Sequence, residues 1–529
     1  MINRRGLSGA VAIVMSSVLI SRLTGFLREM LVPNLMDAAS SDAYNMAFRI
    51  TGLLYEMLVG GAIAAALIPM LTGYIAKGRE KQGWHVAGTF INMVLLISIA
   101  ACILGIVFAK PLVRLFAVGY KGQLVEEETV TVTRILFPSV VFLMLAGLVN
   151  GVLNSYNRFA AAAYGPSIYN IGSCVSIALF GGKNLPAVAW GVVASALIYF
   201  IIQLIFAIPN MRLYEFRFYI YNRGFHRMVR YAVPSLIASS IIQLNLVISS
   251  TFATLFPEGS VTALNMADKT WQVPLGIVAQ GIGIAILPAL SAHLARGDLG
   301  EYKSILQKAL RVVVLLTMPA AVGMMVMNRE IVSAVFRFSS GFNPDYIPMA
   351  GSMLLYFSLA LVFQSVVIVM NRAFYATNDT KTPLYCGIAT MAVNIMLCFV
   401  FYHVFRHVLI MAAAYSLSSI VNCLLLLGIM DRKLQGIYLD RILAFSGKTA
   451  LATLLMALVV LAMRVIPVPE GKTGELLLLM FKAMAGAAVF FMAGFALRLQ
   501  EISDIFRRLL LTAGKLLSRH PSRRGSCEK

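Results

Sequence analysis

Apolar runs long enough to cross a bilayer recur along the whole 529-residue chain. Each run has roughly the 20 residues that a helix needs to span a hydrocarbon core about 30 Å thick. The runs are continuous and do not alternate between polar and apolar residues, and 59% of the chain is hydrophobic. Because backbone groups inside a bilayer must bond to one another, such runs indicate helices. The sequence therefore predicts an all-α polytopic membrane protein with about 14 transmembrane helices.

The first apolar run, about residues 8–32, contains two arginines and a glutamate. A charge at the centre of a membrane helix costs at least ~2.5 kcal/mol, so each needs a partner or a water-filled cavity. At about 100° per residue, Arg22 and Glu29 share a face of the helix. We expect Glu29 to neutralise Arg22 and to leave Arg28 without a partner in its own helix. The run is too long and too charged for a cleavable signal peptide, so it stays as the first helix.

Two further basic residues, Arg49 and Lys269, fall in other predicted spans. Arg49 lies about one and a half turns into its helix, where it can either reach the interface or face a cavity. We expect Arg22, Arg28 and Lys269 to line a cavity with surplus positive charge. Such a cavity favours an anionic substrate, and phosphate above all, because arginine binds phosphate with two parallel hydrogen bonds.

Acidic and metal-ligating residues give weaker signals. Asp42 is either the N-cap of the second helix, a place that Ser40 or Ser41 could also take, or a charge at the external mouth of the cavity. The run Glu126 to Glu128 predicts a solvated face. His403 and His407 are four residues apart without a nearby carboxylate, and the six cysteines show no paired spacing. We predict neither a metal site nor a disulfide.

The basic residues are distributed unevenly along the chain. A net charge of +21 would suggest a nucleic-acid partner in a soluble protein, but most of the 44 Lys and Arg residues fall in alternate loops. The positive-inside rule therefore places both termini in the cytoplasm, and no nucleic-acid partner is expected. The junction Arg212 to Arg230 mixes arginines with aromatic residues, and is a topological anchor, an interfacial amphipathic segment, or both. We expect the basic tail to rest on anionic membrane lipids.

An internal repeat follows from three matches at an offset of about 220 residues. Asn45-Met46-Ala47 recurs as Asn265-Met266-Ala267, the small-residue stretch before Pro69 recurs before Pro288, and an Asn-to-Pro turn recurs at 154–166 and 371–383. Parallel repeats are typical of transporters that alternate access around a central site. The predicted parts are a first six-helix lobe at 1–210, a cytoplasmic linker at 211–228, a second six-helix lobe at 229–431, two extra helices at 432–498 and a basic tail at 499–529.

Five segments carry a family resemblance: SRLTGFLRE (21–29), SDAYNMAFR (41–49), GGAIAAALIP (60–69), GVLNSYNRF (151–159) and NDTKTP (378–383). Together they resemble the MurJ (MviN) family of lipid II flippases, in the multidrug/oligosaccharidyl-lipid/polysaccharide exporter superfamily. The similarity runs through about residues 8–430. It implies two lobes around a cationic cavity, with the last two helices forming a groove for an undecaprenyl tail.

The resemblance also implies site residues. Arg22 and Arg28 match the two cavity arginines of helix 1, Asp42 matches the acidic residue that opens helix 2, and Lys269 stands where many members have arginine. Lysine keeps the charge but loses the planar fork. Some relatives are proposed to couple transport to sodium through a carboxylate of helix 11, but this chain has Asn394 and then Cys398 there, so no sodium site is predicted.

The expected function is transport of lipid II from the cytoplasmic to the outer leaflet, with Arg22, Arg28, Lys269, Asp42 and Arg49 as candidate substrate-binding residues. No cofactor is expected, and the membrane potential or an ion gradient would drive the cycle. Cell-wall synthesis proteins are candidate partners. The alternatives are a flippase for another polyprenyl-linked sugar, a drug/cation antiporter, and a membrane glycosyltransferase that uses lipid II. The surplus of basic residues argues against the antiporter, and the repeat argues against the enzyme.

Overall fold

The computed structural model describes residues 4–60, 63–467 and 471–503, and every regular element in these ranges is helical. Ten of the described helices are long and apolar enough to cross a membrane. The fold is therefore that of a multi-pass helical membrane protein. Part of the small-residue stretch near Gly60, most of the basic tail and Cys527 lie outside the described residues. The other five cysteines are buried and free, as predicted.

The chain forms two compact units. Unit 1 comprises Met1–Thr270, Val332–Met353 and Gly387–Ser418, and unit 2 comprises Trp271–Ile331, Leu354–Cys386 and Ser419–Lys529. Unit 1 thus joins the predicted first lobe to three segments that the sequence assigns to the second. Each unit is described below by itself.

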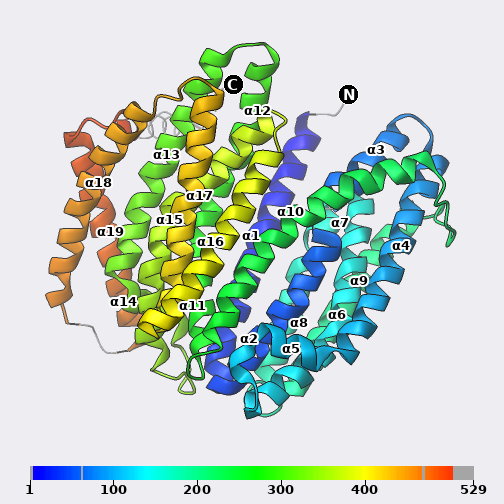
Figure 1. The fold of residues 1–529 in the computed structure, drawn as a ribbon, viewed down its shortest axis with the longest axis horizontal. Helices are drawn as coiled ribbons and strands as arrows, with labels where there is room; N and C mark the ends of the chain where they lie inside the picture. Colours follow the sequence, from blue (N-terminus) through cyan, green and yellow to red (C-terminus); the bar gives the residue numbers. More distant parts are fainter. Residues whose placement is uncertain (1–3, 61–62, 468–470, 504–529) are drawn as a thin grey trace, which may run out of the picture. The chain divides into compact units, whose positions relative to one another are not determined.

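Unit 1 is built on the first ten α-helices. They are α1 (Arg4–Leu35), α2 (Ala38–Tyr55), α3 (Ile68–Ala76), α4 (Glu80–Val107), α5 (Ala109–Phe116), α6 (Leu124–Ser155), α7 (Phe159–Ala163), α8 (Gly165–Phe180), α9 (Leu185–Ala207) and α10 (Arg223–Ala253), with the short helices η1 (Glu56–Gly60), η2 (Ile63–Leu67), η3 (Val118–Tyr120) and η4 (Ile208–Asn210) between them. Helix α1 runs from the start of the chain to the end of unit 1 where α2 and α5 lie (Figure 1). We call this the α1–α2 end.

Unit 2 contains α12 (Gln280–Ala295), α13 (Leu299–Val326), α18 (Leu439–Ala462) and α19 (Lys472–Ala496), with η5 (Leu275–Ala279) and η6 (Met463–Val465). Five helices contribute one part to each unit: α11 (Ser260–Pro274), α14 (Asn328–Phe336), α15 (Tyr346–Ala376), α16 (Lys381–Phe405) and α17 (Ile410–Lys433). The main core of unit 2 packs α12, α13, α15 and α17 around buried residues such as Tyr302 and Phe374. The Tyr302 hydroxyl donates to the carbonyl of Ala373 at 2.8 Å, which satisfies the polar tip of an otherwise apolar side chain.

The NDTKTP segment forms a turn that is held by hydrogen bonds to the Asp379 side chain. Asn378 has φ +55°, and Asp379 accepts hydrogen bonds from the Thr382 amide at 3.0 Å and the Thr382 hydroxyl at 2.9 Å. Nζ of Lys433 donates to Oδ2 of Asp379 at 2.8 Å, the oxygen that also accepts from the Thr382 hydroxyl. Burial would raise the pKa of Asp379, but the hydrogen bonds from Lys433 and Thr382 outweigh it and lower the pKa to about 2. The segment is therefore a helix N-cap for α16.

Residues 211–222, within the predicted linker, lie between η4 and α10, which starts at Arg223. This segment lies on α4, where the Asn92 amide donates to the backbone oxygens of Glu215 at 3.4 Å and Arg217 at 3.0 Å. The Tyr219 ring stacks on His85 with 4.4 Å between ring centroids. The outward side chains of this segment include exposed Phe216, Phe218 and Tyr221. The linker is thus an extended strap with aromatic side chains exposed beside a membrane-spanning helix.

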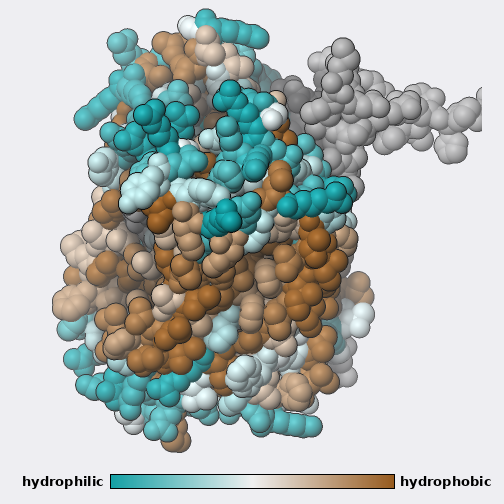
Figure 2. All heavy atoms as spheres, turned by 90° about the vertical axis from the view of Figure 1, so that its right-hand side faces the viewer, coloured by the Kyte–Doolittle hydropathy of each residue, from teal (hydrophilic) through white to brown (hydrophobic). Residues whose placement is uncertain are grey.

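The surface agrees with a membrane protein. On the face displayed in Figure 2, hydrophobic side chains form a belt between two hydrophilic ends. In α4, Ile103, Leu104 and Val107 are each more than half exposed. Exposed apolar side chains of this density are stable in lipid and unfavourable in water.

Candidate functional site

Arg28 is held on the buried side of α1 by two neighbours. Its Nη2 donates to Oε1 of Glu29 at 2.7 Å, and its guanidinium carbon lies 5.0 Å from the centroid of the Phe48 ring. The side chains of Arg28 and Glu29 are only 15% and 10% exposed. The expectation that Arg28 has no partner in its own helix was therefore wrong.

The predicted pair between Arg22 and Glu29 was also wrong, because the carboxylate of Glu29 accepts from Arg28 and Asn265. Seven residues along a helix correspond to a rise of about 10.5 Å, so Arg22 and Glu29 lie about two turns apart. The second carboxylate oxygen of Glu29 accepts a hydrogen bond from Nδ2 of Asn265 at 2.6 Å, which directs Glu29 toward α11. Arg22 is exposed on α1.

Asn265 is the centre of a hydrogen-bonded network between α1, α2 and α11. Besides Glu29, its Nδ2 also contacts Oδ1 of Asn45 at 3.2 Å, and its Oδ1 accepts from Nη2 of Arg49 at 3.2 Å. Asn45 in turn donates to the Thr262 hydroxyl oxygen at 3.1 Å. Asn45 and Asn265 begin the two copies of the repeated Asn-Met-Ala segment. The corresponding residues of the two copies are thus in direct contact.

Asp42 does not cap its own helix. The N-cap of α2 is Asp37, whose side chain accepts from the Ser40 amide at 2.8 Å. Asp42 lies within α2, 1% exposed, and accepts from the amides of Gly259 and Thr262, each at 2.8 Å, and from the Thr262 hydroxyl at 2.7 Å. A carboxylate at the N-terminus of α11 satisfies otherwise unpaired amides and complements the helix dipole. Asp42 therefore caps a helix more than 200 residues away in the chain.

A buried tyrosine adds to the surroundings of Asp42. Tyr120 ends η3 in the loop between α5 and α6 and is 2% exposed. Burial and, next, the nearby charge of Asp42 raise the pKa of Tyr120 well above its usual value. The phenol therefore stays neutral beside the Asp42 carboxylate.

The remaining two candidate cations lie in the same region. Arg49 is 3.8 Å from the Asp268 carboxylate, and Lys269 is close enough to Glu29 for their charges to attract. Three basic residues, Arg28, Arg49 and Lys269, thus accompany three acidic ones, Glu29, Asp42 and Asp268. Among these six residues the positive and negative charges are equal in number, so the predicted positive surplus is largely cancelled there.

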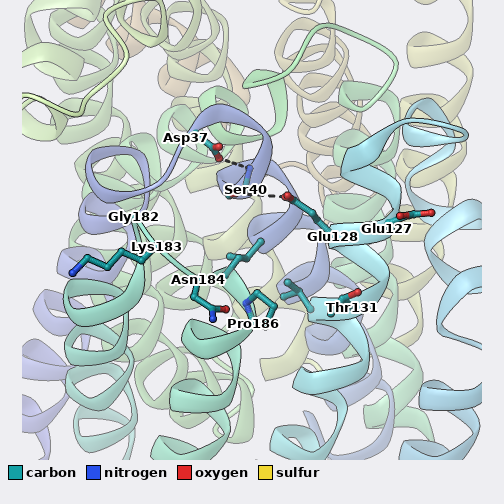
Figure 3. Close-up of a pocket in the computed structure, with 12 residues that line it drawn as sticks. Asp37, Ser40, Glu127, Glu128, Thr131, Gly182, Lys183, Asn184 and Pro186 are labelled. Carbon is teal, nitrogen blue, oxygen red and sulfur yellow. Dashed lines mark hydrogen bonds between the residues drawn. The ribbon is translucent and has the colours of Figure 1, made fainter.

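A pocket of about 500 Å³ opens at the same end of unit 1, between α2, α6 and the turn before α9. It is lined by Asp37, Glu127 and Glu128 together with Lys183, whose side chain points away from the carboxylates (Figure 3). Its acidic lining does not suit a phosphate-bearing substrate. The predicted solvated face was wrong for Glu126, which is 4% exposed and accepts from Arg114 at 2.6 Å and from the Gly122 amide at 2.7 Å.

The sequence singled out the charged residues of the network but missed the polar residues that connect them. Asn45 and Asn265 were recognised only as landmarks of the repeat, and Thr262 was not recognised at all. A usable signal was present, because an asparagine in an apolar membrane run needs hydrogen-bond partners as a charge does.

Comparisons with known proteins agree with the resemblance. A family model described as lipid II flippase MurJ matches residues 34–482. The lipid II flippase MurJ of Burkholderia cenocepacia is 29% identical over 445 residues, which are 81% of this chain and 84% of that protein.

Two solved structures share the fold. A lipid II flippase MurJ in an inward closed conformation covers 94% of this chain and 100% of its own, with a TM-score of 0.77 at 21% identity. An inward-facing multidrug resistance MATE transporter of the MOP superfamily covers 81% of this chain and 98% of its own, with a TM-score of 0.67 at 12% identity. Since the family model spans most of the residues, including α2 and α11 with their joined asparagines, this chain belongs to the MurJ family.

Proposed function

We propose that this chain is a lipid II flippase that moves the undecaprenyl-pyrophosphate-linked head group from the cytoplasmic to the outer leaflet by alternating access. The observation that carries the proposal is the network around Asn265, in which the two copies of a repeated segment are hydrogen-bonded to each other at the α1–α2 end of unit 1. The similarity to named lipid II flippases supports the choice of substrate. Lipid transport, without covalent catalysis, is the whole activity.

The candidate cations would act in three stages. Arg22, exposed on α1, would contact the pyrophosphate first, and Arg28 and Lys269 would join it when the network opens and releases them from Glu29. Arg49 would follow when its contacts with Asn265 and Asp268 break. Lys269 supplies charge without the planar fork of arginine, so we assign bidentate phosphate contact to the arginines. Asp42 would hold the closed state by capping α11.

The mechanism would use two six-helix lobes, 1–210 and 229–431, joined by a linker and followed by two extra helices. Helices α4 and α13 are each 28 residues long, and they begin at positions separated by the repeat offset of about 220 residues. The π-helical segments Glu56–Gly60 and Leu275–Ala279 are separated by the same offset. Fourteen spans in this order would let the lobes rock against each other around a central cavity.

The expected orientation in the membrane and the contacts with lipid follow from the distribution of basic residues. Both termini would face the cytoplasm, where the strap at 211–222 and the basic tail would bind anionic lipids of the inner membrane. An inside-negative potential favours outward movement of anionic groups by about 2.3 kcal/mol per charge per 100 mV, which would drive the cycle without a cofactor. The cell-wall synthesis machinery would supply and consume the lipid.

The proposal is tested by depleting the native flippase of a bacterial host and supplying this chain in trans while lipid II exposure on the outer leaflet is followed. The parent chain should restore exposure. Arg28→Ala and Lys269→Ala should each reduce it roughly tenfold or more, because each removes a charge that binds phosphate. Glu127→Gln, at the acidic pocket, is the control that should behave like the parent.

If inserted Arg28→Ala and Lys269→Ala proteins restored exposure as well as the parent, the assignment of the cations would be wrong. A parent chain that restored export of another polyprenyl-linked sugar, and not of lipid II, would identify it as a related flippase.

A further inference from the structure

Tyr44 carries a buried hydroxyl close to the candidate cations of unit 1. It lies in α2, directly before Asn45, and is 2% exposed. Within the part of the chain that the structure describes, its hydroxyl has no hydrogen-bond partner. A buried hydroxyl without a partner costs about 1–3 kcal/mol, and phenylalanine would fill the same space without that cost. The hydroxyl of Tyr44 therefore adds nothing to the stability of the closed structure.

The ring of Tyr44 belongs to a group of aromatic side chains around Arg28. Its centroid lies 4.5 Å from that of Phe48, one turn further along α2, and the guanidinium carbon of Arg28 lies 5.0 Å from the Phe48 centroid. Tyr169 of α8 is also near enough for its hydroxyl to feel the charge of Arg28, as the hydroxyl of Tyr44 does. The guanidinium donates to Glu29, which leaves the Tyr44 hydroxyl unpaired beside it.

On one side of Arg28, helices α1 and α8 are closely packed. Nδ2 of Asn170 donates to the carbonyl of Ser21 at 3.1 Å, and an added Cβ at Gly25 would lie 3.2 Å from the same nitrogen. One turn further along α8, Sγ of Cys174 lies 3.7 Å from the carbonyl oxygen of Thr24. Because a larger residue at Gly25 would force the helices apart, we expect α1 and α8 to stay together during transport.

On the other side, α2 is attached through the network around Asn265. Asn45, the neighbour of Tyr44, accepts from Asn265 at 3.2 Å and donates to the Thr262 hydroxyl oxygen at 3.1 Å. Opening of the network would therefore loosen α2 next to Tyr44 at the same time as it frees Arg28 from Glu29. The freed guanidinium and the phenol would then be neighbouring donors, one charged and one neutral.

We propose that Tyr44 is a substrate-contacting residue, whose hydroxyl donates a hydrogen bond to a phosphate oxygen of the pyrophosphate held by Arg28. The inference rests on the proposed function and adds a neutral donor to its cations. A phosphate group has several acceptor oxygens, so it can accept from the guanidinium and from the phenol together. The hydroxyl gains its missing partner only in the bound state, so it favours that state over the closed one.

The test compares the full-length parent with Tyr44→Phe, which keeps the ring and removes only the hydroxyl. Binding of undecaprenyl pyrophosphate, transport of lipid II in proteoliposomes and the thermal midpoint without ligand are measured. Tyr44→Phe should bind undecaprenyl pyrophosphate roughly tenfold more weakly, because a hydrogen bond to a charged group is lost. Transport at low lipid II concentration should slow by a similar factor, and the thermal midpoint should equal or exceed that of the parent.

Tyr302→Phe is the matched control in unit 2. It also removes one buried phenol hydroxyl, but this hydroxyl donates to the carbonyl of Ala373 at 2.8 Å. Tyr302→Phe should therefore lower the thermal midpoint and leave binding of undecaprenyl pyrophosphate unchanged. The two variants thus have opposite expected effects on stability and on binding.

A cycle of variants shows whether Tyr44 and Arg28 contact the same phosphate group. Binding of undecaprenyl pyrophosphate is measured for the parent, Tyr44→Phe, Arg28→Ala and the double variant. If the two side chains share one phosphate, Tyr44→Phe should weaken binding by a smaller factor in the Arg28→Ala background than in the parent.

Binding at the parent level by Tyr44→Phe would overturn the inference, and so would an equal loss of binding in the two backgrounds. A lowered thermal midpoint in Tyr44→Phe would also overturn it, because the hydroxyl would then stabilise the closed structure. These outcomes leave the proposed function intact as long as the parent moves lipid II. A parent chain that neither moved lipid II nor bound undecaprenyl pyrophosphate would overturn the proposed function itself, and this inference with it.

Discussion

Buried charges in the two units are stabilised in different ways. In unit 1, Glu29 is shared between Arg28 and Asn265, and Asp42 accepts three hydrogen bonds from the start of α11. In unit 2, Lys482 places both of its described contacts on the single carboxylate of Glu330. A charge in a network loses part of its stabilisation when one partner is removed, whereas a charge with one carboxylate loses most of it. We therefore expect the hydrogen bonds of the network to break and re-form one at a time, whereas the ion pair is either formed or broken as a whole.

The largest effect is expected where one partner supports a buried charge. Glu330→Gln should lower the free energy of unfolding by about 3–5 kcal/mol, because Lys482 stays buried without its carboxylate. Glu29→Gln should cost less, about 1–3 kcal/mol, since Arg28 keeps its contact with the Phe48 ring and the neutral amide still accepts from Asn265. Chemical unfolding in detergent micelles measures both. If Glu29→Gln and Glu330→Gln lowered the free energy of unfolding equally, the distinction between the network of unit 1 and the single ion pair of unit 2 would be contradicted.

The next effect concerns Asp42. Asp42→Ala should cost about 3 kcal/mol, because two amides and one hydroxyl at the start of α11 lose their acceptor in a buried place. Asp42→Asn keeps one acceptor oxygen and should cost about half as much. Hydrogen exchange at the amides of Gly259 and Thr262 is the specific measurement, and slow exchange in Asp42→Ala would rule out the capping role.

A smaller effect is expected at the centre of the network. Asn265→Ala removes the contacts to Glu29, Asn45 and Arg49 but leaves the Arg28 contact of Glu29, so the cost should be about 2 kcal/mol. Asn184→Ala is the matched control, because it also removes one side-chain amide, here at the N-cap of α9. It should lower the free energy of unfolding by about 1 kcal/mol. Thermal unfolding of the two variants tests the ranking, which would fail if Asn184→Ala were the more destabilised.

The smallest effect belongs to the exposed pair. Asp379 and Lys433 are 21% and 38% exposed, and asparagine also caps helices, so Asp379→Asn should cost no more than about 1 kcal/mol. The folded pKa of Asp379, about 2, is below its unfolded value. The stabilisation is therefore complete above about pH 4 and is lost as the pH falls toward 2. Thermal midpoints of the parent and Asp379→Asn should converge over that range, and a constant difference would contradict it.

The sequence predicted the features that depend on local composition. Continuous apolar runs indicated membrane helices, unpaired cysteine spacing indicated free thiols, and repeated segments drew attention to Asn45 and Asn265. Lys482 carried the same signal as Arg22, one basic residue within an apolar run, but it was not singled out. The pairing of Arg22 with Glu29 was wrong because Arg28 and Asn265, one of them distant in the chain, engage the two oxygens of that carboxylate.

The sequence by itself determined that this is a helical membrane protein of the MurJ type with charges inside its spans, because hydropathy and motif content are properties of neighbouring residues. Only the tertiary structure decided the partners of those charges. Asp42 and Gly259 are 217 residues apart in the chain, and Glu29 and Asn265 are 236 apart. The sequence offers each donor many possible acceptors, and the packing of the helices decides which of them lie within hydrogen-bond distance. The same packing turned the two copies of one short segment into partners.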